Sequence, residues 1–160
     1  MRYVLAVLLL LNQAVEDDIT ELTAEEAAVV AQAEGPLELN GLTTLSDEAA
    51  KGLGQHIGDL FLNGLTTLSD EAAKALAQPR GDLSLNGLTT LSAAAAKGLG
   101  QHEGDLFLNG LTTLSAEAAK ALLTQHVGRL SLVGLTTLSA EAAVALQANP
   151  KVRLPRNFGR

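Results

Sequence analysis

Three histidines recur at one position of the sequence and are the side chains best suited to bind a metal. They are His56, His102 and His126, and Pro79 stands where an intervening copy would place another. Two imidazoles in neighbouring coils could share a metal ion, but zinc sites normally use three or four ligands. We therefore expect these histidines to lie in surface loops, and we predict neither a metal site nor a cofactor.

Aspartates form a second recurring set, at Asp59, Asp82 and Asp105, and Arg129 takes the next equivalent position. Stacked carboxylates repel one another unless they accept hydrogen bonds from backbone amides or bind a cation. Capping of backbone amides is the expectation, and weak calcium binding is the alternative.

Threonines occur in adjacent pairs, which would stack into two columns of hydroxyl groups. A regular hydroxyl array can order water, so an ice-binding surface is an alternative. However, adjacent residues of a strand point to opposite faces, and the two columns could not share one flat face. We expect the hydroxyls to satisfy backbone groups at a corner of the chain. The pairs are Thr43/Thr44, Thr66/Thr67, Thr89/Thr90, Thr112/Thr113 and Thr136/Thr137.

No set of residues has the pattern of a catalytic site. Serine, histidine and carboxylate all recur, but on separate corners of a repeat, so a nucleophile, a base and an orienting group do not converge. Gly52 and Gly54 fall within an expected helix rather than in a phosphate-binding loop. The chain has no cysteine, which excludes disulfides and thiolate metal sites. The sequence therefore predicts a protein that is not an enzyme.

All these residues belong to one repeated unit. The segment Leu-Glu-Leu-Asn-Gly-Leu-Thr-Thr-Leu-Ser returns nearly unchanged along the chain, and a degenerate copy precedes it at 20–35. One unit is longer by a residue within 121–125, where we expect the loop after the helix to absorb it. Val152 and Leu154 predict a last short strand. The full copies begin at Leu37, Leu60, Leu83, Leu106 and Leu130.

Each unit predicts a strand, a turn, a short helix and a return loop. Leu-x-Leu has the period of a strand, with both leucines on one face. The serine that ends the segment, such as Ser46, precedes an alanine-rich run and suits a helix N-cap. Such a short helix cannot bury its own apolar surface, so neighbouring units must stack. We predict an α/β, right-handed solenoid of about five to six coils, with short parallel strands on one face and short helices on the other.

The repeated unit resembles the bacterial leucine-rich-repeat-like proteins that contain tandem 23-residue units. The resemblance covers about residues 17–154. It implies binding of other macromolecules, commonly through the strand face. In ordinary leucine-rich repeats two residues separate the last strand leucine from the asparagine, whereas Asn40, Asn63, Asn86 and Asn109 follow that leucine at once. From this spacing we do not expect a standard asparagine ladder, in which each asparagine side chain bonds to the next coil.

The middle residue of each strand is expected to face outward if the two leucines face inward. Phe61 and Phe107 would then be exposed on the sheet, and exposed aromatic residues are often hot spots of binding. The alternatives are that a duplication copied one phenylalanine without a role, or that the end segments cover both. The candidate binding residues are Glu38, Phe61, Ser84, Phe107 and Ser131.

The two ends of the chain differ from the repeats. Residues 1–14 contain Arg2 followed by an apolar run, which predicts either a signal peptide or an apolar cap on the solenoid; 15–154 form the repeat domain, and 155–160 a basic tail. A signal peptide would place the protein outside the cell or at its surface, and otherwise it is cytoplasmic. Membrane contact beyond the N-terminal segment is not expected.

Charge and composition limit the function further. The formal net charge of -7 argues against nucleic acid as a partner. We predict a non-catalytic interaction scaffold that binds a protein or a glycan through its strand face. The alternative is a purely structural spacer or surface-layer module without a dedicated ligand. Terminal coils expose leucines unless they are capped, so end-to-end self-association is also considered.

Overall fold

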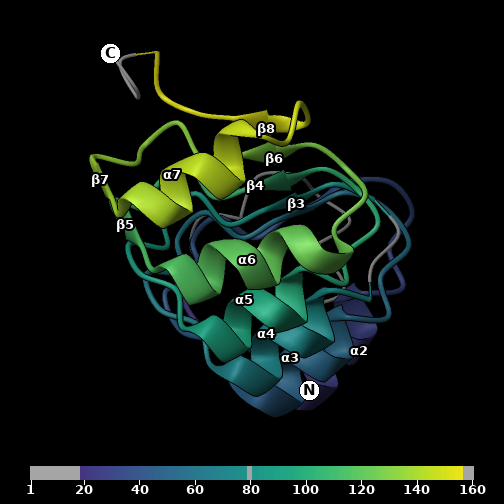
Figure 1. Cartoon of the computed structure of the whole chain (residues 1–160). Helices are drawn as coiled ribbons and strands as arrows, with labels where there is room; N and C mark the ends of the chain where they lie inside the picture. Colours follow the sequence, from purple (N-terminus) through teal and green to yellow (C-terminus); the bar gives the residue numbers. More distant parts are fainter. Residues whose placement is uncertain (1–18, 79–80, 157–160) are drawn as a thin grey trace.

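The chain folds into an α/β solenoid in which a layer of parallel strands lies opposite a layer of stacked helices (Figure 1). The computed structural model describes residues 19–78 and 81–156. The helices are α2 (Ala24–Val30), α3 (Asp47–Leu53), α4 (Asp70–Leu76), α5 (Ala93–Leu99), α6 (Ala116–Gln125) and α7 (Ala140–Gln147). The solenoid predicted from the repeat is confirmed.

Six strands form one sheet in the order β1-β2-β3-β4-β6-β8, and every pair in it is parallel. They are β1 (Leu37–Glu38), β2 (Leu60–Phe61), β3 (Leu83–Ser84), β4 (Leu106–Phe107), β6 (Leu130–Ser131) and β8 (Val152–Arg153). A second pair, β5 (Thr113–Leu114) and β7 (Thr137–Leu138), lies at the threonine corner. Equivalent residues of neighbouring repeats therefore stack directly on one another, and β8 confirms the predicted last strand.

A serine or threonine N-cap stands directly before every one of these helices. The hydroxyl oxygen of Ser69, for example, accepts a hydrogen bond of 3.0 Å from the backbone N–H of Ala72. In the degenerate first copy, Thr23 and Glu26 form a reciprocal capping box. A hydroxyl at this position satisfies one of the free N–H groups at the start of a helix. The local signal in each repeat thus fixes where each helix starts.

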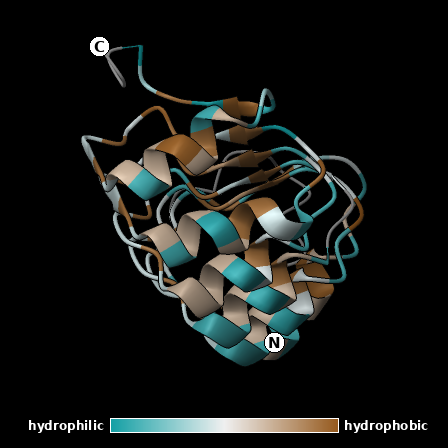
Figure 2. Ribbon diagram, in the orientation of Figure 1, coloured by the Kyte–Doolittle hydropathy of each residue, from teal (hydrophilic) through white to brown (hydrophobic). Residues whose placement is uncertain are grey.

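Leucine and alanine layers fill the space between the strands and the helices. In the central coil Leu83, Leu85 and Leu88 are fully buried, and so are Ala95 and Ala96 of the helix that follows. Figure 2 shows the hydrophobic residues on the strands and the inner sides of the helices, with hydrophilic residues outside. One continuous core therefore runs through all the coils, as expected for units that cannot bury their surfaces alone.

The repeat that starts at Leu106 is one residue longer than the others, and its additional residue lengthens a helix instead of a loop. Helix α6 has 10 residues, whereas α3, α4 and α5 have 7 each. The expectation that the loop after the helix absorbs this residue is therefore wrong. The longer helix satisfies the extra backbone groups by its own hydrogen bonds.

The N-terminal segment 1–14 and most of the basic tail lie outside the described residues. The proposed signal peptide, the apolar cap and residues 157–160 are thus not described structurally. Within residues 19–78 and 81–156 no helix is long and apolar enough to cross a membrane.

Candidate functional site: the strand face

The strand face carries a single column of middle residues. Strand pairing places Glu38 beside Phe61, Phe61 beside Ser84, Ser84 beside Phe107, and Phe107 beside Ser131. The structure therefore brings the five predicted binding residues together in one row. Neighbouring strands lie about 4.8 Å apart, so the two phenylalanines are separated by about 10 Å with one serine between them.

The five residues differ in how far solvent reaches them. Glu38 is exposed and both phenylalanines are half-buried, but Ser84 and Ser131 are only 4% and 9% exposed. The expectation that all five middle residues are exposed is therefore wrong for the two serines and only partly met by the two phenylalanines. Serine is smaller than the phenylalanine on either side of Ser84, so the neighbouring rings and the adjoining asparagines cover it.

An asparagine ladder borders this row, contrary to the expectation from sequence spacing. The side-chain oxygen of each asparagine accepts a hydrogen bond from the backbone N–H of the equivalent residue one coil later. The distances are 3.2 Å from Asn40 to Asn63, 3.0 Å from Asn63 to Asn86, 3.0 Å from Asn86 to Asn109, and 3.3 Å from Asn109 to Val133. Because neighbouring repeats stack in register, any asparagine at the turn can reach the next coil.

The two buried serines strengthen this ladder rather than offering free hydroxyl groups. The hydroxyl of Ser84 donates to the side-chain oxygen of Asn63 at 2.7 Å and accepts from the side-chain amide of Asn86 at 2.8 Å. The hydroxyl of Ser131 donates to Asn109 at 2.7 Å. The groups open to a ligand on this face are therefore aromatic and charged, because the serine hydroxyls are already used.

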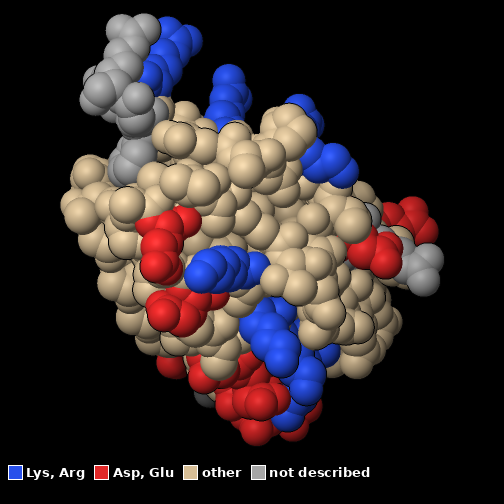
Figure 3. Space-filling view, in the orientation of Figure 1, with Lys and Arg blue, Asp and Glu red and all other residues tan. Residues whose placement is uncertain are grey.

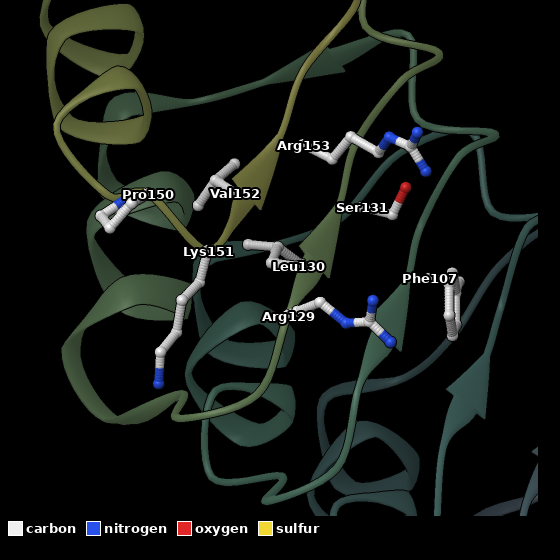
Figure 4. A pocket seen from close by; sticks show the side chains of 8 residues that line it. All are labelled: Phe107, Arg129, Leu130, Ser131, Pro150, Lys151, Val152 and Arg153. Atoms are coloured by element: carbon white, nitrogen blue, oxygen red, sulfur yellow. The ribbon is translucent and has the colours of Figure 1, made fainter.

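A groove of about 410 Å³ opens at the C-terminal end of the strand face (Figure 4). Phe107 forms one wall, and the guanidinium groups of Arg129 and Arg153 lie on either side of Ser131. Arg153 is not among the five candidate residues expected on this face. Its place between Val152 and Leu154 of the expected last strand marks it as an outward residue.

The aspartate column forms a second ladder beside the strands. Asp59 accepts from the backbone N–H of Asp82 at 2.8 Å, and Asp82 from that of Asp105 at 3.1 Å. Asp105 accepts from the backbone N–H of Arg129 at 2.9 Å and from its Nε at 2.7 Å. Backbone capping is thus confirmed, and no three metal-binding side chains gather within the described part of the chain.

Arg129 is held in place by this ladder. Its Nη2 lies 2.6 Å from Oδ2 of Asp105, and the Arg129 side chain is 80% exposed. The side-chain hydrogen bond from Arg129 holds the pKa of Asp105 below its usual value. Asp105 therefore stays ionised and orients a guanidinium group whose remaining donors face solvent at the groove.

The histidines are buried, so the expectation of surface loops is wrong. His56 and His102 are 1% and 0% exposed, and the rings of His102 and His126 stack with their centroids 6.5 Å apart. Nδ1 of His126 lies 2.9 Å from the backbone oxygen of His102. The rings of His56 and His102 each fill a corner where a neighbouring glycine leaves room: a Cβ would lie 2.9 Å from Nε2 of His56 if built on Gly58, and 3.0 Å from Nε2 of His102 if built on Gly104.

The two ring nitrogens of His102 form no hydrogen bond with the described residues. Its ring is near the backbone carbonyls of Ala77 and Gly81, but neither ring nitrogen reaches hydrogen-bonding geometry with a partner among the described residues. Burial lowers the pKa of His102, because the charged form loses its hydration, and the nearby His126 acts in the same direction. His102 is therefore a packing residue that prefers to stay neutral.

Acid should destabilise the protein through His102. Because its pKa is lower in the folded state, the unfolded chain binds the proton more readily, and stability falls as the pH drops through the unfolded value of 6.5. We expect urea unfolding to show a smaller loss of stability between about pH 7.5 and about pH 5 for His102→Leu than for the wild type. The exposed neighbour Gln101→Leu is the control, and an equal loss in all three proteins would contradict this assignment.

The threonine corner meets the expectation at two positions. All the paired threonines are exposed, and the hydroxyl of Thr136 donates to the backbone oxygen of Thr112 at 3.1 Å. The hydroxyl of Thr43 bonds to the oxygen of Thr20 at 3.4 Å in the same way. At these two positions the hydroxyl therefore satisfies a backbone carbonyl of the preceding coil.

The sequence matches no protein-family model, and no curated protein is significantly similar to it. The candidate site therefore rests on the residues of the strand face alone.

Proposed function

We propose that this chain is a non-catalytic interaction module that binds a protein or glycan partner through its strand face. One observation supports this most: Phe61 and Phe107 lie partly exposed in a single row on the side of the sheet opposite the helices, and Phe107 lines the groove. Half-exposed aromatic rings on a rigid backbone offer a large contact area at a small cost in conformational entropy.

The arrangement of the polar groups also favours binding over catalysis. The serine hydroxyls next to the phenylalanines donate within the asparagine ladder, and the histidines lie buried in the return corners. Asp105 has a lowered pKa, the opposite of what a general acid needs. The resemblance to leucine-rich-repeat-like proteins fits the same proposal, since such solenoids present one extended face to a partner.

The double variant Phe61→Ser/Phe107→Ser tests the proposal. Ligands are first selected with the wild-type protein from a displayed random peptide library and, in parallel, from a glycan array. We expect the double variant to bind the selected ligands at least about tenfold more weakly, because it loses both central aromatic contacts. Binding is measured by isothermal titration calorimetry, and thermal unfolding confirms that the variant is folded.

A matched control removes two exposed apolar residues from another surface. Ile57 and Val127 are 77% and 57% exposed in the return loops, so Ile57→Ser/Val127→Ser should leave the affinity unchanged. Equal losses in the two double variants would contradict a site on the strand face. If neither selection gives a ligand, the protein is better explained as a structural spacer, for which the ladders and the continuous core provide a rigid body.

A further inference from the structure

The row of outward strand residues continues one coil beyond the predicted site and ends in a cation. Arg153 pairs in register with Ser131, so the row begins with Glu38 and ends with Arg153. Arg153 is exposed, and the structure shows no ion pair to it within residues 19–78 and 81–156. The positive charge at this end of the face is therefore available to a ligand.

Basic residues gather at this end although the protein as a whole is acidic. Residues 129–160 include Arg129, Lys151, Arg153, Arg156 and Arg160, and their one acid is Glu141. Glu141 lies in α7, on the helix layer, 3.7 Å from Lys120. Figure 3 shows basic side chains around the C-terminal coil, whereas acidic and basic side chains lie together over the helices of the earlier coils. The groove itself is lined by three of the cations and by no acid.

The cations of the groove differ in how they are held. Arg129 is fixed by Asp105, while Nζ of Lys151 donates to the backbone oxygen of Val127 at 2.6 Å and points away from the arginines (Figure 4). The two guanidinium groups therefore form the charged part of the groove. A guanidinium is planar and matches a carboxylate through paired hydrogen bonds, which an ammonium group does not.

The backbone beside the groove can accept another strand. β8 pairs with β6 on one side, and none of the described strands pairs with its other side. Val152 and Leu154 flank Arg153 and are only half-buried against the core. An extended peptide could add to this edge through main-chain hydrogen bonds, and its apolar side chains would complete the burial of these two residues.

We infer that the groove and the edge of β8 bind an extended acidic peptide with apolar, acidic and apolar residues in succession. Its carboxylate would meet Arg153 in register, and the residues on either side would pack on Val152 and Leu154. This inference rests on the proposed function and names the ligand of that face. A sulfated glycan could use the arginines but not the strand edge, so the structure favours a peptide.

The probe is a fluorescent peptide that follows the repeat's own strand rule, Pro-Leu-Glu-Leu-Asn-Gly-Leu, which is the sequence of residues 36–42. Fluorescence anisotropy with the full chain should show saturable binding that weakens as salt is added, because exposed ion pairs are screened. Arg153→Glu should weaken binding roughly fivefold or more, since it replaces an attraction by a repulsion. Lys97→Glu, on the outer side of α5, is the charge-matched control and should not change the affinity.

The same peptide with lysine in place of glutamate should bind the wild type more weakly and Arg153→Glu more strongly. Equal affinity for the two peptides would overturn the inference and leave the proposed function intact, because the strand face could still bind neutral ligands. Stronger competition by a heparin oligosaccharide than by unlabelled peptide would overturn it in favour of a glycan. Self-association of the chain by sedimentation equilibrium, abolished by Arg153→Glu and by excess peptide, would overturn a separate peptide ligand in favour of a second copy at this edge.

Discussion

Replacing Gly87 by alanine should lower the free energy of unfolding by about 3 kcal/mol, one of the two largest effects expected in this protein. A Cβ built at this position would lie 2.2 Å from the backbone oxygen of Asn63 and 2.6 Å from that of Leu65. Both are backbone atoms of the preceding coil, so neither can move without separating the two coils. The glycine is thus required by the close stacking of coils.

Urea unfolding followed by circular dichroism measures this effect, and Thr90→Ala serves as the control. Thr90 is exposed in the same coil, so its loss should change stability by no more than about 0.5 kcal/mol. A Gly87→Ala variant as stable as the control would show that the coils are not in backbone contact at the asparagine turn. The spacing of the strands, and with it the row on the strand face, would then need revision.

Replacing Leu85 by alanine should cost about 2–5 kcal/mol. Leu85 is fully buried in the central coil and belongs to the single core that joins all the coils. Truncation removes favourable burial and leaves a cavity that the coils on both sides cannot fill. Because the core is almost without aromatic residues, no large neighbouring side chain can move into the space.

Ile57→Ala provides the comparison for Leu85→Ala, because both changes shorten an aliphatic side chain and Ile57 is 77% exposed. We expect Ile57→Ala to change the free energy of unfolding by no more than about 0.5 kcal/mol. The midpoint of thermal unfolding gives an independent measurement. Similar small losses in the two variants would contradict the inward orientation of the Leu-x-Leu positions.

The fold could be predicted from sequence because its signals are local and repeated. Alternating leucines place Leu83 and Leu85 inside, and a serine before an alanine-rich run, as at Ser69, marks the start of each helix. A repeat of nearly constant length then requires equivalent residues to stack. These arguments need no knowledge of distant contacts, which explains why the architecture was confirmed.

The details that failed depend on what lies in the next coil. His102 follows a helix and resembles a loop residue, but its ring is buried against the preceding coil where glycine leaves space. Ser84 was expected to be exposed, yet the phenylalanines of both neighbouring strands lie beside it. The asparagine ladder depends on the stacking of Asn63 on Asn40 and not on the spacing within one repeat. Aligning the repeats column by column would have given the neighbours of each residue.

Only part of the candidate site could be predicted from the sequence. Phe61 and Phe107 could be placed on the strand face from alternation alone. The groove could not, because it forms where Phe107, Arg129 and Arg153 of three successive coils meet. Arg153 is not among the candidate binding residues, because the last unit lacks the Asn-Gly-Leu segment that marks the other strands.

Cysteine footprinting shows most directly whether a ligand binds through the strand face. The chain has no cysteine, so Glu38→Cys next to Phe61 and Glu71→Cys on α4 each introduce one exposed thiol. Alkylation by a maleimide is timed with and without a saturating amount of the tightest selected ligand. We expect the ligand to slow alkylation at position 38 and to leave alkylation at position 71 unchanged. Protection at position 71 alone, or no protection at position 38, would contradict binding through the strand face.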